Sequence, residues 1–129
     1  MNNVLHLLIV GAGGAVGAIG RYLVVALATN YFGNRFPWGT LLVNLIGSFL
    51  LGAAFVIVLE KLQGHAELRS LIMVGFLGAF TTFSTFSLEV FSLFHSGHVF
   101  SAMAYVLMSV ILCVLASGLA VTLTRMLIQ

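Results

Sequence analysis

The chain has 129 residues, of which 61% are hydrophobic and 6% are charged, and its mean hydropathy is +1.20. Because an ordinary soluble domain has about 25% charged residues, this composition indicates an all-α integral membrane protein that is too short for a second domain. The net charge of +2 comes without a basic cluster, which argues against a nucleic-acid partner, and the single cysteine, Cys113, excludes an intrachain disulfide.

Four stretches are long and apolar enough to cross a lipid bilayer, because a spanning helix needs about 20 apolar residues. The short connections between them predict that neighbouring helices run antiparallel, and Pro37 suits the start of the second helix. We therefore expect a single transmembrane domain over residues 1–129, with helices at about 4–28, 39–59, 68–94 and 99–127.

The first helix is rich in glycine and carries Arg21, which we expect near its end. Gly13 and Gly17, like Ser48 and Gly52 in the second helix, have the four-residue spacing that lets helix backbones approach in lipid. This contact can lie within one chain or between two copies, and the residues leave both possibilities open. For Arg21 three interpretations stand: extension to the membrane surface, attraction of an anion at a pore mouth, or a structural tie to a loop.

Polar side chains follow one face of the second helix. Thr40, Asn44 and Ser48 recur every four residues, a spacing that places them along one stripe. Asn44 is the most informative of the three, because a carboxamide at membrane depth must find partners. It either forms a hydrogen bond between helices or lines a polar path, and the shared stripe favours the path.

A second polar track follows the fourth helix, again in steps of four. Its members are Tyr105, Ser109, Cys113 and Ser117. A single serine or threonine in a membrane helix usually bonds to its own helix, but four polar residues in register favour a role in lining a path.

The third apolar segment contains the most unusual stretch of the chain, in which hydroxyl residues alternate with phenylalanines from Gly75 to Glu89. Polar groups at membrane depth are costly unless they are buried in protein or line a wet path. The low helix propensity of Gly78–Thr82 predicts that the third helix is broken within the membrane. Backbone carbonyls freed by such a break suit a small monovalent cation such as Na⁺.

The phenylalanines within this stretch can be interpreted in two ways. Phe83 and Phe86, with Phe76 and Phe80, would form an ordinary packing stripe. Alternatively, their positive ring edges meet an anion, while hydroxyl and amide groups replace part of its hydration shell. The alternation with hydroxyls favours an anion path without a fixed cation. Glu89 would then pair with Arg21, or carry a proton or a cation.

The residues at this point resemble the Fluc/CrcB family of fluoride ion channels over essentially the full chain. The matching segments are Gly13–Tyr22, Gly39–Gly47 and Gly75–Glu89, and the Thr-Thr-Phe-Ser-Thr-Phe run in the last is highly specific. Two positions depart from the family pattern. Ala79 stands where a second glycine is usual, and Cys113 stands where the track more often has a hydroxyl.

The resemblance implies an antiparallel dual-topology homodimer with two pores that passively conduct fluoride and lower its cytoplasmic concentration, in a bacterial inner membrane. It implies a structural Na⁺ at the dimer interface, held by the backbone carbonyls of Gly78 and Thr81. From the residues themselves we add Arg21 as a charge at the pore mouth. The implied fluoride pore comprises Asn44, Phe83, Phe86, Tyr105, Ser109 and Ser117. The hydroxyls beside the phenylalanines add Thr82, Ser84 and Thr85 to the predicted pore.

Three other functions compete with this interpretation. In a small dual-topology, proton-coupled multidrug exporter we expect a lone glutamate in the first helix, which here contains Arg21 and no acidic residue. A non-transporting subunit would leave the polar tracks unexplained. An enzyme is disfavoured because the sequence has no nucleophile–base pair and no metal constellation; the spacing of His95 and His98 lacks further ligands.

The charges of the short loops leave the orientation in the membrane balanced. With the N-terminus inside, the inner side would carry Lys61, Arg69 and Arg125, and the outer side would carry Arg35 and Arg21. Since the Lys/Arg bias of short loops sets orientation, so small a difference predicts that both orientations insert.

Overall fold

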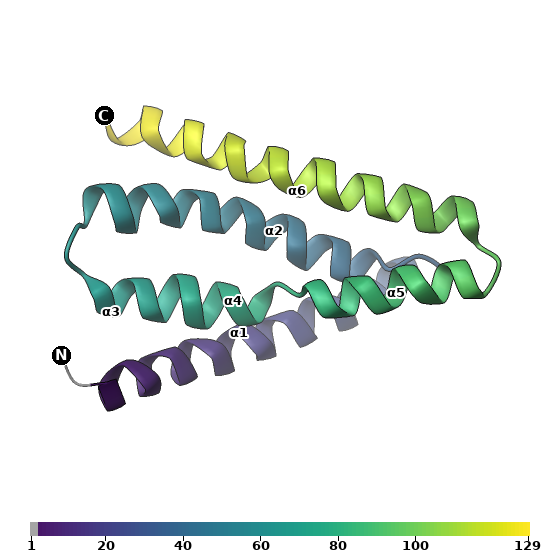
Figure 1. Cartoon of the computed structure of the whole chain (residues 1–129), viewed down its shortest axis with the longest axis horizontal. Coiled ribbons are helices and arrows are strands. Elements are labelled where there is room, and N and C mark those ends of the chain that lie inside the picture. The colour runs from purple at the N-terminus through teal and green to yellow at the C-terminus, as the bar shows by residue number, and fades with distance from the viewer. Residues whose placement is uncertain (1–2) are drawn as a thin grey trace.

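The computed structural model describes residues 3–129, and the regular structure in this range is entirely helical (Figure 1). Two of the segments are π-helical, η1 and η2, and each continues an α-helix without a turn between them. The elements are α1 (Asn3–Phe32), α2 (Trp38–Ala54), η1 (Phe55–Lys61), α3 (Ala66–Leu68), η2 (Arg69–Leu77), α4 (Gly78–Phe80), α5 (Phe83–His95) and α6 (Val99–Ile128).

These elements form four segments that are long and apolar enough to cross a membrane: Asn3–Phe32, Trp38–Lys61, Ala66–His95 and Val99–Ile128. The all-α architecture with four such helices is therefore confirmed. Neighbouring segments run in opposite directions, and the two ends of the chain lie at the same end of the molecule (Figure 1). The first helix continues past its expected end at Ala28 to Phe32.

Glycines with positive φ stand in the connections. Gly33 follows α1 with φ 79° and donates its N–H to the carbonyl of Thr29 at 2.9 Å, and Gly97 stands between α5 and α6 with φ 84°. Residues with a Cβ rarely adopt this left-handed conformation, so glycine is the natural residue just past the end of a helix. The connection between η1 and α3 likewise contains a glycine with positive φ, Gly64 at 92°.

Small residues bring the helices together within one chain. A Cβ added at Gly13 or Gly17 of α1 would overlap a backbone carbonyl of η2, that of Leu71 or Phe76 respectively. At Gly52 of α2 it would meet the Ser117 carbonyl of α6. Both four-residue small-residue pairs are thus used for packing inside the chain, which is one of the two possibilities that the sequence left open.

Buried side chains form two small clusters. In the first, Leu41 of α2 packs with Phe86 of α5 and Tyr105 of α6. The second joins Ala54, Val58 and Leu77. Many large apolar side chains point outward instead, such as Phe100, which is 86% exposed. An outward apolar surface fits lipid or a second chain.

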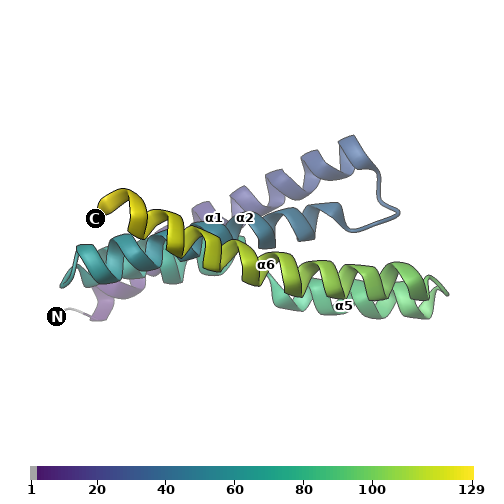
Figure 2. The ribbon, with the colours of Figure 1, turned by 90° about the horizontal axis from the view of Figure 1, so that it is seen from above.

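The two ends of the molecule differ in shape. In Figure 2 the connection between α1 and α2 lies apart from α5 and the start of α6. Between these parts lies one of the two cavities described below.

Candidate functional site

The backbone is extended at two residues between α4 and α5. Thr81 has φ −87° and ψ 156°, and Thr82 has φ −150° and ψ 123°, both typical of a strand rather than a helix. The interruption is visible as a thin coil in Figure 1. Gly78 itself is helical, with φ −62° and ψ −36°. The two extended residues therefore lie at the end of the Gly78–Thr82 stretch and not at its glycine, because the chain leaves the helix only after Phe80.

Asn44 of α2 holds the extended residue Thr82 with both atoms of its carboxamide. Its Oδ1 accepts the Thr82 N–H at 2.8 Å, and its Nδ2 donates to the Thr82 carbonyl at 3.0 Å. These two bonds satisfy backbone groups that a continuous helix would pair by itself. The half-buried carboxamide of Asn44 thus finds its partners in the backbone of the interrupted segment.

Arg21 contacts the same segment from α1. Its Nε donates to the Ala79 carbonyl at 3.0 Å. The expected position near the end of the first helix is wrong, because α1 continues for a further three turns to Phe32. This hydrogen bond is a structural tie, but it joins Arg21 to helix α4, just before the extended residues, and not to a loop.

The side chain of Thr82 also caps the N-terminus of α5. Its Oγ1 accepts the Thr85 N–H at 3.3 Å and donates to Thr85 Oγ1 at 3.1 Å. This is the usual hydrogen-bond pattern of a threonine before the first turn of a helix. Ser84 is exposed, and its Oγ lies 3.4 Å from Thr82 Oγ1. Thr82, Ser84 and Thr85 thus form one hydroxyl cluster at the start of α5.

Two carbonyls at the interruption lose the donors that a continuous helix would supply. The Thr82 N–H, which would serve the Gly78 carbonyl, donates to Asn44 instead. The Thr85 N–H, which would serve the Thr81 carbonyl, donates to Thr82 Oγ1. Within residues 3–129, side chains donate to the carbonyls of Ala79 and Thr82 but to neither of these two. The Gly78 and Thr81 carbonyls therefore retain acceptor capacity.

A cavity of about 330 Å³ lies beside the interruption, between α2, α5 and α6. We call it the break pocket. Phe86 in its wall is 9% exposed and packs 5.6 Å, between ring centroids, from Phe83, which is 77% exposed. The lining residues are Asn44, Gly47, Ser48, Leu51, Leu77, Thr81, Thr82, Phe83, Phe86, Ser109, Val110, Cys113 and Val114.

The polar track of α6 is divided among three roles. Ser109 and Cys113 line the break pocket, and the buried Ser109 Oγ has no hydrogen-bond partner among the residues described. Ser117 does not line it, because its Oγ donates to the Ser48 carbonyl at 2.9 Å and ties α6 to α2. Tyr105 is fully buried above the pocket. Of the four residues, two therefore face the cavity.

Tyr105 and Glu89 connect this region to a second cavity. The Tyr105 hydroxyl donates to Glu89 Oε1 at 3.0 Å, and the Tyr105 ring meets Phe86 edge-on at a centroid distance of 5.0 Å. The structure therefore does not have the pairing of Glu89 with Arg21 that the sequence left possible.

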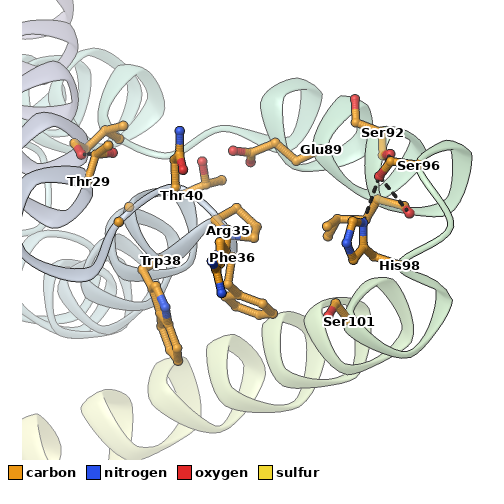
Figure 3. Close-up of a pocket in the computed structure, with 16 residues that line it drawn as sticks. Thr29, Arg35, Phe36, Trp38, Thr40, Glu89, Ser92, Ser96, His98 and Ser101 are labelled. Carbon is orange, nitrogen blue, oxygen red and sulfur yellow. Dashed lines mark hydrogen bonds between the residues drawn. The ribbon is translucent and has the colours of Figure 1, made fainter.

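The second cavity, of about 720 Å³, opens at the end of the molecule where α1 meets α2 and α5 meets α6; we call it the end pocket (Figure 3). Glu89 and Thr40 belong to its lining, so it begins beside the Tyr105–Glu89 bond. Most of its polar residues form no pattern in the sequence that marks a site, because they lie in loops and on helix ends that only the fold brings together. They include Arg35, Ser92, Ser96, His98 and Ser101.

The chain matches known proteins over nearly all of its length. The family described as "CrcB-like protein, Camphor Resistance (CrcB)" matches residues 8–121. A protein of Hahella chejuensis named "Fluoride-specific ion channel FluC" is 61% identical over 126 residues, which cover 98% of this chain and 99% of that protein.

Proteins with the same name in Coxiella burnetii and Magnetococcus marinus are 44% and 47% identical. The matches cover 95% of this chain and 100% of the first protein, and 91% of this chain and 95% of the second. A family match over residues 8–121 and four membrane-capable helices agree with the resemblance found in the sequence. The chain is an integral, multi-pass membrane protein that belongs to the CrcB-like family.

Proposed function

We propose that the chain is a fluoride channel that passively conducts F⁻ and so lowers cytoplasmic fluoride. The observation that carries this proposal is the break pocket: an uncharged cavity at membrane depth that combines phenylalanine rings with the unpartnered hydroxyl of Ser109. The names of the relatives, all fluoride-specific ion channels, support the choice of ion.

The chemistry of the cavity suits a small anion. Fluoride holds water strongly, so a pore must replace that water with hydrogen-bond donors or other positive groups. The Ser109 hydroxyl can donate, and the edges of the Phe83 and Phe86 rings carry partial positive charge. The lining contains no lysine, arginine or histidine, so the anion meets no full charge that would hold it there.

The proposed route continues from the break pocket to the end pocket. Phe86 lines the break pocket and contacts Tyr105, and Tyr105 bonds to Glu89, which lines the end pocket. The two cavities are therefore joined through two side-chain contacts. Rotation of the Phe86 or Tyr105 ring would open the connection.

Flux from proteoliposomes tests the function. Purified protein in liposomes loaded with potassium fluoride should release F⁻ rapidly when a potassium ionophore is added, and liposomes loaded with chloride should release little. Equal release of both anions would contradict fluoride selectivity. Release that requires a proton gradient would instead support a proton-coupled transporter.

We further propose that two chains assemble as an antiparallel, dual-topology homodimer with two pores in a bacterial inner membrane. Phe83 supports this assembly, because a phenylalanine that is 77% exposed at the edge of the break pocket leaves that side of the cavity uncovered. A second chain would complete the wall.

The loop charges permit the dual topology but do not require it. Since Arg21 lies within α1, the side opposite the chain termini has Arg35, and the side of the termini has Lys61, Arg69 and Arg125. Arg125 forms an ion pair with Glu60, in which Arg125 Nε lies 3.2 Å from Glu60 Oε2.

Two fusions test the topology: a C-terminal reporter that is active only in the cytoplasm, and another that is active only outside the inner membrane. Both fusions should give signal. Signal from one side alone would rule out the antiparallel dimer.

The carbonyls of Gly78 and Thr81 support the proposal of a structural Na⁺ at the dimer interface. Carbonyl oxygens are hard ligands suited to this ion, and these two are not used by the helix or by side-chain donors among residues 3–129. Two chains would bring four such oxygens together.

Removal of Na⁺ tests this ion site. Exchange of Na⁺ for N-methylglucamine should weaken the dimer or reduce fluoride flux. Thr81→Ala should be mild in Na⁺, because the Thr81 hydroxyl donates to the Leu77 carbonyl of η2 and the backbone oxygen of residue 81 remains. Sodium-independent dimer stability and flux would count against the site.

A further inference from the structure

The end pocket combines an unpaired cation with a histidine whose ring is held in place. Arg35 comes from the connection between α1 and α2, and His98 stands between α5 and α6. Both side chains lie in the lining, together with the hydroxyls of Ser92, Ser96 and Ser101 (Figure 3). None of these five residues is among the pore residues predicted from the sequence, and the proposed route has given them no role.

Arg35 is available to an anion. Its side chain is exposed, and within residues 3–129 the guanidinium has no hydrogen-bond or ion-pair partner. By contrast, Arg21 donates to Ala79, and Arg125 is paired with Glu60. Among the described residues that line the end pocket, Arg35 is thus an unpaired positive charge that can attract a passing anion.

Ser96 holds the ring of His98 in place. Ser96 Oγ donates to the carbonyl of Ser92 at 2.8 Å and lies 3.0 Å from His98 Nδ1. The imidazole is thereby fixed in the lining of the end pocket.

We propose that Arg35 and protonated His98 form an anion-concentrating mouth in the end pocket, which supplies fluoride to the pore and strengthens as the pH falls. This inference rests on the proposed function. A cleft that holds positive charge raises the local concentration of anions, and the effect weakens as salt screens it. The positive charges also offset the carboxylate of Glu89, which faces the same cavity.

Fluoride flux at low ionic strength tests the role of Arg35. In Arg35→Gln the fluoride concentration that gives half-maximal flux should rise about two- to fivefold, with a smaller effect at saturating fluoride. Arg35→Lys should behave as the wild type. Arg69→Gln is the matched control, because it removes one exposed positive charge at the other end of the molecule. An inert salt near 1 M should abolish the difference between Arg35→Gln and the wild type.

A comparison between about pH 8 and about pH 5.5 tests His98. The half-maximal fluoride concentration of the wild type should fall as the pH falls, because the added imidazolium charge attracts the anion. His98→Gln, which keeps a hydrogen-bonding side chain beside Ser96, should lose this dependence, and Arg35→Gln should keep it. Protein-free liposomes at each pH correct for the leak of hydrogen fluoride through lipid.

Other titratable groups near His98 could also cause a pH dependence of the flux. Glu89 and His95 are on α5, and Tyr105 of α6 bonds to Glu89. If His98→Gln keeps the pH dependence, one of these groups titrates instead, and the role of His98 is overturned. If Arg35→Gln matches the wild type, or Arg69→Gln shifts equally, the role of Arg35 is overturned while the channel itself stands. Wild-type protein that conducts no fluoride would refute both the inference and the proposed function.

Discussion

Asn44 and Thr82, which are 38 residues apart in the chain, are joined by two hydrogen bonds of 2.8 and 3.0 Å. The carboxamide takes the place of a peptide group: it accepts from the N–H and donates to the carbonyl of one extended residue. Because water is not available to unpaired backbone groups at membrane depth, this pair allows the helix to stop and start again. It holds the geometry on which the break pocket depends.

Asn44→Ala should therefore destabilise the protein. It leaves an N–H and a carbonyl of Thr82 unpaired, at a cost of about 1–3 kcal/mol for each group. Asn44→Asp should also abolish flux, because the carboxylate cannot donate to the Thr82 carbonyl and places a negative charge in an anion path. Thermal unfolding in detergent and fluoride release from liposomes measure the two effects. If Asn44→Ala unfolds at the same temperature as the wild type, the two hydrogen bonds between Asn44 and Thr82 are not needed for stability.

Phe83→Ile should separate conduction from packing. Phe83 is 77% exposed, so the folded chain loses little contact, but the ring edge at the break pocket disappears. Fluoride flux should fall by about tenfold or more, equal to about 1.4 kcal/mol in the barrier. Phe100→Ile is the matched control, since that ring is 86% exposed and lies outside the lining of the break pocket. Equal flux in both variants would favour the packing interpretation.

Arg21→Gln should act differently from Arg35→Gln. The Arg21 Nε–Ala79 carbonyl bond ties α1 to the residues before the interruption, and a hydrogen bond to a charged group contributes about 1.5–3 kcal/mol. We expect a lower unfolding temperature and reduced flux at every fluoride concentration, without rescue by salt. A shift in half-maximal fluoride alone, at unchanged stability, would instead assign Arg21 to the pore mouth.

Gly17→Ala should destabilise the chain by about 1–3 kcal/mol through overpacking. The added Cβ would overlap the Phe76 carbonyl, so α1 and η2 would have to separate. Gly11→Ala on the same helix provides the control, because nothing lies within 4 Å of its Cβ position. There we expect no loss, or a gain of up to about 1 kcal/mol from helix propensity. Unfolding temperatures in detergent compare the two variants, and equal values would contradict close packing at Gly17.

Much of the architecture follows from local properties of the sequence. Four apolar stretches of sufficient length predict four membrane helices, because a helix satisfies its backbone groups by itself. The hydroxyl and phenylalanine run from Gly75 to Glu89 likewise locates the unusual segment, since its composition is costly in an ordinary lipid-facing helix. The family resemblance rests on the same contiguous residues.

The tertiary structure decides which atoms meet and where the third segment leaves the helix. Propensity marked the stretch Gly78–Thr82 but not the residues within it at which the backbone becomes extended. These are Thr81 and Thr82, and Asn44 of another helix supplies the hydrogen-bond partners of Thr82. The same holds for Arg21 and Ala79, 58 residues apart, and for Arg35 and His98 in one cavity. Such pairs depend on how each helix is rotated and shifted against its neighbours. Close contacts at Gly13, Gly17 and Gly52 fix that arrangement, and no single segment of the sequence contains it.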